Sequence, residues 1–249
     1  MSSRRVAMLG VELDALTMDE TVARCEELVA ADCFAQHMAI NAAKVVKLRD
    51  DDRLREIVNR CELINADGQA VVWASRLLGA PLPERVAGID LMLRLFELAE
   101  RRELPVYILG ARQEILERAV ARLRELHPAL KVAGYRDGYF DESETSAVCE
   151  EIRASGAKLL FVAIPTPRKE YFLGEHGPAL GVPFVMGVGG AIDVVAGITK
   201  RAPERWQRAG LEWLYRLLQE PRRMFGRYVR TNAQFIWMVG RALAARPGH

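Results

Sequence analysis

Short apolar runs alternate with longer stretches of helical periodicity along the first 199 residues of the chain. The apolar runs end in glycine or polar residues, which is typical of strands buried within a sheet. A regular exchange of such strands with helices predicts βαβ units. We therefore expect a mainly parallel, Rossmann-like α/β sheet flanked by helices. The predicted strands are 34–40, 62–65, 106–109, 131–135, 158–164 and 182–186.

The predicted helices carry recognisable start signals. Thr17 and Glu20 have the spacing of a capping box, which predicts a helix from Thr17 to about Ala31. Residues 6–13 alternate weakly and predict a short strand or hairpin before it. The remaining helices of this part of the chain are predicted at 42–48, 53–60, 69–78, 90–102, 114–126, 143–154 and from Arg168 onward.

The sheet pattern stops after Gly197, so we divide the chain into an α/β body, 1–199, and a helical appendage, 200–249. Pro203 and Pro221 suit the first turn of a helix, and we expect helices near 203–208, 210–219 and 221–245. In the last helix, mostly apolar side chains recur at helical spacing. They are Phe225, Tyr228, Val229, Asn232, Phe235, Ile236, Val239 and Leu243.

The appendage and the body carry opposite net charges. Residues 200–249 hold eleven Lys and Arg against three Asp and Glu, a net charge of +8, and three of the four Trp. Residues 1–199 hold 24 basic and 30 acidic residues, a net charge of −6. A basic helix with aromatic residues is typical of a membrane surface, where we expect Trp213, Phe225, Phe235 and Trp237 to enter the headgroup boundary. The alternative is a surface helix that packs on its own body.

The composition bounds the class of protein. Of the 249 residues, 50% are apolar and 27% charged, as in ordinary globular proteins. The four cysteines form no C-x-x-C pair, which indicates a reduced compartment and argues against a zinc site. The N-terminus lacks the apolar core of a signal peptide, and no apolar run has the length of a membrane span. We expect a cytoplasmic protein with peripheral membrane contact.

Carboxylates and glycines mark the ends of the predicted strands. Asp67 follows strand 62–65, where α/β folds place reactive groups; an equally weighted alternative is a cap of the next helix. Gly110 and the loop with Gly187, Gly189 and Gly190 follow two other strands, and their N–H groups can approach phosphates. These loops together favour a nucleotide. The acidic run 50–52 suggests a metal site, but capping of the following helix explains it better.

Three long motifs resemble the WecG/TagA/CpsF family, glycosyltransferase family 26. They read ADGQAVVWASRLLGAPLPERVAGIDL from residue 66, GVGGAIDVVAGITKRAP from residue 187 and LEWLYRLLQEPRR from residue 211, with RDGYF at 136–140. The resemblance implies a Rossmann-like core and a C-terminal appendage that reaches the inner face of the bacterial plasma membrane. It also implies inverting, metal-independent transfer from a UDP-sugar to a polyprenyl-diphosphate-linked sugar in cell-surface polysaccharide synthesis.

The same resemblance implies roles for individual residues. Asp67 corresponds to the family's proposed general base. Arg216, Arg223 and Arg227 correspond to appendage arginines that meet the lipid diphosphate. The other implied positions are Asn41, Arg85 and Asp193 in the substrate pocket, and Gly110 and Tyr139 near the nucleotide.

The chain departs from the family pattern at two places. The family's T-x-N begins with Ala39 here, so a pocket hydroxyl is missing. The family's G-x-G-x-P-K-Q-E reads AIPTPRKE at 163–170, which puts Lys169 in place of glutamine. A cation at that position suggests a substrate with extra negative charge, such as a uronic acid in place of N-acetylmannosamine. It is equally compatible with a divergent or inactive member of the family.

Two other classes of function compete with a glycosyltransferase. A nicotinamide-dependent oxidoreductase expects G-x-G-x-x-G after the first strand, and that loop is missing from this sequence. A nucleic-acid-binding protein could use the basic tail, but aromatic residues at helical spacing favour a bilayer. The sequence predicts no cofactor. It leaves open the donor sugar, the acceptor sugar, the linkage and the oligomeric state, with a homo-oligomer among the alternatives.

Overall fold

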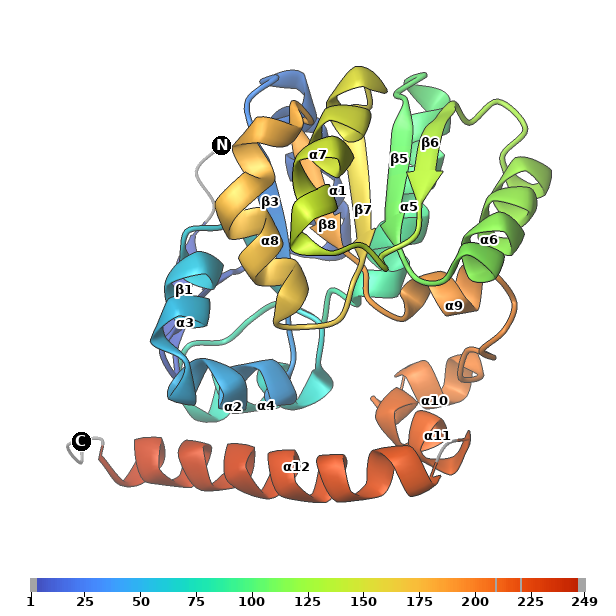
Figure 1. Cartoon of the computed structure of the whole chain (residues 1–249). Helices are drawn as coiled ribbons and strands as arrows, with labels where there is room; N and C mark the ends of the chain where they lie inside the picture. The colour runs from blue at the N-terminus through green and yellow to red at the C-terminus, as the bar shows by residue number, and fades with distance from the viewer. Residues whose placement is uncertain (1–3, 209, 220, 246–249) are drawn as a thin grey trace.

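The computed structural model describes residues 4–208, 210–219 and 221–245 of the chain. A six-stranded sheet forms its centre, in the order β4-β3-β8-β7-β5-β6, and every pairing within it is parallel (Figure 1). Its strands are β3 (Ala35–Ile40), β4 (Leu63–Ala66), β5 (Val106–Gly110), β6 (Val132–Arg136), β7 (Leu159–Ala163) and β8 (Phe184–Gly187). The Rossmann-like α/β prediction is confirmed.

Residues 6–13 contribute to an antiparallel hairpin of β1 (Arg5–Met8) and β2 (Val11–Asp14) outside this sheet. Two short 3₁₀ helices, η1 (Glu142–Glu144) and η2 (Gly177–Leu180), complete the connections.

Helices cover both faces of the sheet. The side chains of β5 show why, since Val106 and Ile108 enter the core on one face and Tyr107 and Leu109 the core on the other. A strand buried on both faces must be apolar throughout, which is the pattern that predicted it. One face carries α1 (Met18–Ala30), α5 (Gly88–Arg101), α6 (Gln113–Leu126) and α9 (Ala191–Val195). The other carries α2 (Ala42–Asp50), α3 (Asp52–Asn59), α4 (Gln69–Leu77), α7 (Thr145–Ala154) and α8 (Arg168–His176).

Two of the predicted helix caps are present in the structure, at the starts of α1 and α3. The capping box of Thr17 and Glu20 is present at the start of α1. In the acidic run, Asp51 accepts a hydrogen bond from the Leu54 N–H at 2.9 Å as the N-cap of α3, and its other oxygen accepts from the Tyr171 hydroxyl. The capping interpretation is therefore confirmed for Asp51.

In its described residues the appendage forms the helices α10 (Glu204–Arg208), α11 (Glu212–Gln219) and α12 (Pro221–Ala244), which agrees with the prediction. The long helix α12 runs beneath α2 and α4 along one side of the molecule (Figure 1). Its side chains Phe235, Met238 and Val239 are buried in the same core as Val45 and Val46 of α2. The expectation that Phe235 enters a membrane is thus wrong, because this ring packs inside the protein.

Other apolar side chains of α12 face outward. Val229, Ile236, Trp237 and Leu243 are exposed, on a different side of the helix from Phe235. Within the described residues, no helix combines the length and the apolar character needed to cross a membrane.

Candidate active site

The carboxyl ends of all six parallel strands meet at one edge of the sheet, and most predicted site residues follow them. Asn41 follows β3, Asp67 follows β4, and the loop 187–190 begins at the end of β8. The neighbouring strands β3 and β8 are followed by helices on opposite faces, α2 and α9. Connections that diverge in this way leave a crevice at the strand ends, which is where open α/β sheets bind ligands.

Asp67 is fixed at this edge by the segment that starts α5. Its Oδ1 accepts a hydrogen bond of 2.8 Å from the Gly88 N–H, and its own N–H donates to the Ile40 carbonyl at 2.8 Å. Gly68, not Asp67, is the N-cap residue of α4, and among the described residues no side-chain hydrogen bond caps the start of that helix. The alternative reading of Asp67 as the cap of α4 is therefore wrong. None of the hydrogen bonds found among the described residues uses its Oδ2.

Asn41 lies beside Asp67 across a tight loop contact. Its Oδ1 accepts from the Lys44 N–H at 3.0 Å and caps α2, and no hydrogen bond within the described part of the chain uses its amide nitrogen. A Cβ at Gly68 would stand 3.2 Å from the Asn41 Cα and Cβ. The glycine therefore lets the loops after β3 and β4 approach, and the carboxylate and the amide belong to one site.

The glycine loop after β8 is covered by a side chain at Gly187 and has free space beside Gly189. Gly189 adopts a φ of +50°, and a Cβ there would meet nothing within 4 Å. At Gly187, a Cβ would lie 2.4 Å from the Lys169 Cε, so the lysine side chain crosses directly over this glycine. Asp193 lies at the same loop, with its Oδ2 3.5 Å from the Cβ position of Gly190.

Lys169 belongs to a buried ionic cluster with Lys44 and Glu170, whose side chains are 7%, 9% and 0% exposed. Glu170 Oε1 lies 2.9 Å from the Lys44 Nζ and 3.2 Å from the Lys169 Nζ. The Thr166 hydroxyl donates to the same oxygen at 3.0 Å. Two ammonium groups share one carboxylate, so the cluster carries an excess positive charge at the carboxyl edge.

The pKa values of this cluster reflect its burial. Burial, and secondarily the charge of Lys44, lowers the pKa of Lys169 to about 8. Burial alone would raise the pKa of Glu170, but the ammonium groups of Lys44 and Lys169 outweigh it and lower that pKa to about 2. At neutral pH the cluster is thus charged and holds one more cation than anion.

Arg85 lies next to Asp67 because the Val86 N–H donates to the Ala66 carbonyl at 3.0 Å. Its guanidinium Nη1 donates to Glu212 Oε2 of α11 at 3.2 Å. The appendage thus reaches the candidate site through a charged contact.

Gly110, the last residue of β5, and Tyr139, which follows β6, lie at the other half of the same edge. Gly110 adopts a φ of +119°, and a Cβ there would stand 2.5 Å from the Ala163 carbonyl carbon. Packing against the end of β7 therefore requires a glycine at this position. The Tyr139 side chain is exposed, and its hydrogen bond with Arg112 raises the pKa of that arginine.

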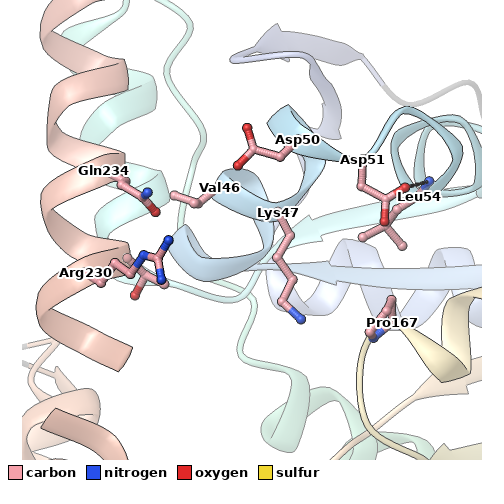
Figure 2. A pocket seen from close by; sticks show the side chains of 9 residues that line it. Val46, Lys47, Asp50, Asp51, Leu54, Pro167, Arg230 and Gln234 are labelled. Carbon is pink, nitrogen blue, oxygen red and sulfur yellow. Dashed lines mark hydrogen bonds between the residues drawn. The ribbon is translucent and has the colours of Figure 1, made fainter. Parts of the chain in front are cut away.

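A cavity of about 400 Å³ opens between α2, α3 and α12, beside the Pro167 loop. Figure 2 shows Arg230 and Gln234 facing it from α12, and Lys47 and Asp50 from α2. Lys47 Nζ also donates to the Thr166 carbonyl at 3.4 Å, which joins this cavity to the Lys169 cluster.

The structure therefore places Asn41, Asp67, Arg85, Lys169, the 187–190 loop and Asp193 along the carboxyl edge of the neighbouring strands β4, β3 and β8. The side chains of Arg216, Arg223 and Arg227 lie outside the described part of the structure. Sequence reasoning missed Lys44, Glu170 and Glu212. The sequence holds a signal for Lys44, because this residue comes three positions after Asn41, in the first turn of the predicted helix 42–48.

The whole-chain comparison agrees with this geometry. The family model described as the glycosyl transferase WecG/TagA/CpsF family matches residues 6–248, nearly the whole chain. This match does not fit the oxidoreductase and nucleic-acid alternatives. The chain belongs to the WecG/TagA/CpsF family and is a glycosyltransferase of cell-surface polysaccharide synthesis.

Proposed function

We propose that the protein transfers a sugar from a UDP-sugar to a polyprenyl-diphosphate-linked sugar, with inversion and without a metal ion. The observation that carries this proposal is Asp67, a carboxylate fixed by Gly88 beside Asn41, on the same edge of the sheet as Arg85 and a buried cluster with excess positive charge. Oδ2 of Asp67 takes the proton of the acceptor hydroxyl. The hydroxyl oxygen bonds to the anomeric carbon of the donor while the bond from that carbon to the UDP oxygen breaks.

Fixed cations carry the charge that develops on the departing UDP. Arg85 offers a guanidinium fork suited to a diphosphate, and Lys169 lies across the open glycine loop. Preorganised cations of this kind stabilise a leaving diphosphate without a metal ion. Asp51 of the acidic run is already engaged by the Leu54 N–H and the Tyr171 hydroxyl, which disfavours it as a metal ligand.

Lys169 also bears on the donor sugar. The buried cluster has one more cation than anion, and burial of an uncompensated charge is costly. An anionic group completes such a cluster. We therefore propose a donor of the uronic acid type, with an N-acetylmannosamine-type donor as the competing choice.

The appendage brings the site to a membrane. The exposed side chains Val229, Ile236, Trp237 and Leu243 lie near Arg230 and Arg241 on α12, and the Arg241 guanidinium stands 5.4 Å above the Trp237 ring. An apolar stripe beside arginines suits an anionic bilayer on the inner face of the plasma membrane. The acceptor diphosphate would meet Arg216, Arg223 and Arg227. The cavity with Lys47 and Arg230 lies between α2, α3 and α12.

The decisive experiment is the Asp67→Asn variant, assayed with a panel of UDP-sugars and a short-chain lipid-diphosphate acceptor. We expect turnover to fall by roughly 10²–10⁴-fold, while UDP binding and the melting temperature stay close to wild type. Asp32→Asn is the matched control, because Asp32 precedes β3 at the opposite edge and pairs with Lys158 at 2.7 Å. Near-normal turnover of Asp67→Asn would remove the proposed base. Wild-type protein inactive with every donor would favour the non-catalytic alternative.

A further inference from the structure

A network of four charged side chains joins the appendage to the edge that carries Asp67. Arg85 donates to Glu212 Oε2 at 3.2 Å, and the Arg201 Nε lies 3.9 Å from Glu212 Oε1. Arg201 Nη2 forms an ion pair of 2.5 Å with Asp90 in the first turn of α5. Two guanidinium groups and two carboxylates balance in charge, and Glu212 stands between the two arginines.

The network is mostly removed from water. The side chains of Glu212, Arg85 and Arg201 are 10%, 16% and 23% exposed. A charged hydrogen bond at such a site is stronger than one at the surface, and its geometry is better defined. The backbone around Glu212 is also fixed, because Gly210 packs so closely on Gln69 at the start of α4 that a Cβ would approach the Gln69 Cγ to 2.6 Å.

We propose that Glu212 is a positioning residue for the reaction: from the appendage, it holds the Arg85 guanidinium in the orientation that receives the donor diphosphate. This inference rests on the proposed function, in which Arg85 binds that diphosphate. An arginine has five N–H donors in a rigid fork. The bond from Nη1 to Glu212 leaves the Nε and Nη2 donors for phosphate oxygens.

The arrangement makes donor binding depend on the position of the appendage. Arg85 lies on an irregular segment between α4 and α5, and a long side chain there loses conformational freedom when it binds. Glu212 removes part of that freedom before the donor arrives, which is how preorganisation strengthens binding. A body without its appendage would keep Arg85 but lose the carboxylate that orients it.

The test is a double-mutant cycle on the full-length protein, with UDP binding measured by calorimetry and kcat and KM measured with the best donor. We expect Glu212→Gln to weaken UDP binding by about tenfold and to raise KM for the donor more than it lowers kcat. Arg85→Ala should weaken binding at least as much. In the Arg85→Ala background, Glu212→Gln should change binding less than twofold, because the residue acts through Arg85.

Glu204→Gln is the matched control, an exposed acid on the neighbouring helix α10 that should leave UDP binding unchanged. Melting temperatures of all variants separate positioning from unfolding, and Glu212→Asp should recover part of the binding. An equal loss in the wild-type and Arg85→Ala backgrounds would overturn the proposal, since Glu212 would then act on the fold. Tighter UDP binding by Glu212→Gln would also overturn it, because the carboxylate would then compete with the diphosphate. Wild-type protein that binds no UDP would overturn the proposed function as well.

Discussion

The buried contact between α12 and the body has a measurable energetic consequence. Phe235 is 4% exposed and belongs to the core that also contains Val45, Val46 and Val72. Truncation of a buried phenylalanine to alanine costs about 3–5 kcal/mol through lost burial and the cavity left behind. A domain of ordinary stability has about 5–15 kcal/mol, so Phe235→Ala should consume a large share of it.

The neighbouring residue provides the control. Ile236 is 69% exposed, so Ile236→Ala should change the free energy of unfolding by no more than about 0.5 kcal/mol. Urea denaturation of both variants gives the midpoint and the slope. A lower midpoint at unchanged slope reports lost stability rather than a change of unfolded state.

In a membrane-binding assay, the order of the two effects should be reversed: substitution at Ile236 should matter and substitution at Phe235 should not. Ile236→Ala, combined with Trp237→Ala, should weaken flotation with anionic liposomes, because it removes exposed apolar area from the proposed membrane face. Phe235→Ala should float like wild type below its unfolding temperature. If Phe235→Ala cost less than about 1 kcal/mol, α12 would not be part of the core, and the reasoning above would fail.

Three further predictions concern the site and the backbone. Transfer should survive EDTA, and loss of activity with rescue by Mg²⁺ or Mn²⁺ would revive the acidic run 50–52 as a metal site. With an anionic donor, kcat/KM should fall as pH rises through about 8, because Lys169 is cationic below that pKa and neutral above it. Lys169→Gln should remove this fall of kcat/KM and reduce the preference for a uronic acid. An unchanged pH profile in the variant would contradict the role of Lys169. Gly110→Ala should destabilise the protein, because the new Cβ would stand 2.5 Å from the Ala163 carbonyl carbon at a φ of +119°. Gly240→Ala should stabilise it by up to about 1 kcal/mol, because a Cβ at this position of α12 would meet nothing within 4 Å. Equal melting temperatures for the two variants would contradict this.

The sequence predicted the elements of this fold far better than their arrangement. Strand and helix periodicity are local, so β5 and α12 lie within about one residue of the predicted 106–109 and 221–245. Helix α9 (Ala191–Val195) was missed, since five residues after a glycine loop are too short to show a period. The strand order depends on crossovers that leave no local signal.

The candidate site also contains residues that the local sequence predicts and residues that only the tertiary fold brings together. Asp67 and Asn41 could be predicted because both follow strands, and the ends of parallel strands meet at one edge. The partners of Arg85 and Lys44 could not, because Glu212 and Glu170 lie 127 and 126 residues away along the chain. Pairing over such distances depends on the tertiary fold, which sequence spacing does not encode.

The two apolar sides of α12 explain how one helix can serve both the core and a membrane. Val229, Ile236 and Leu243 are seven residues apart, which is nearly two helical turns, so they share one side of α12. Phe235, Met238 and Val239 occupy another side, against α2. Helical spacing alone could not separate these sides, and so the sequence assigned Phe235 to the membrane. Because the sides are distinct, the appendage does not have to leave the body in order to bind a bilayer. The proposed membrane contact would then hold α11 in place as well, and with it the carboxylate of Glu212 against Arg85.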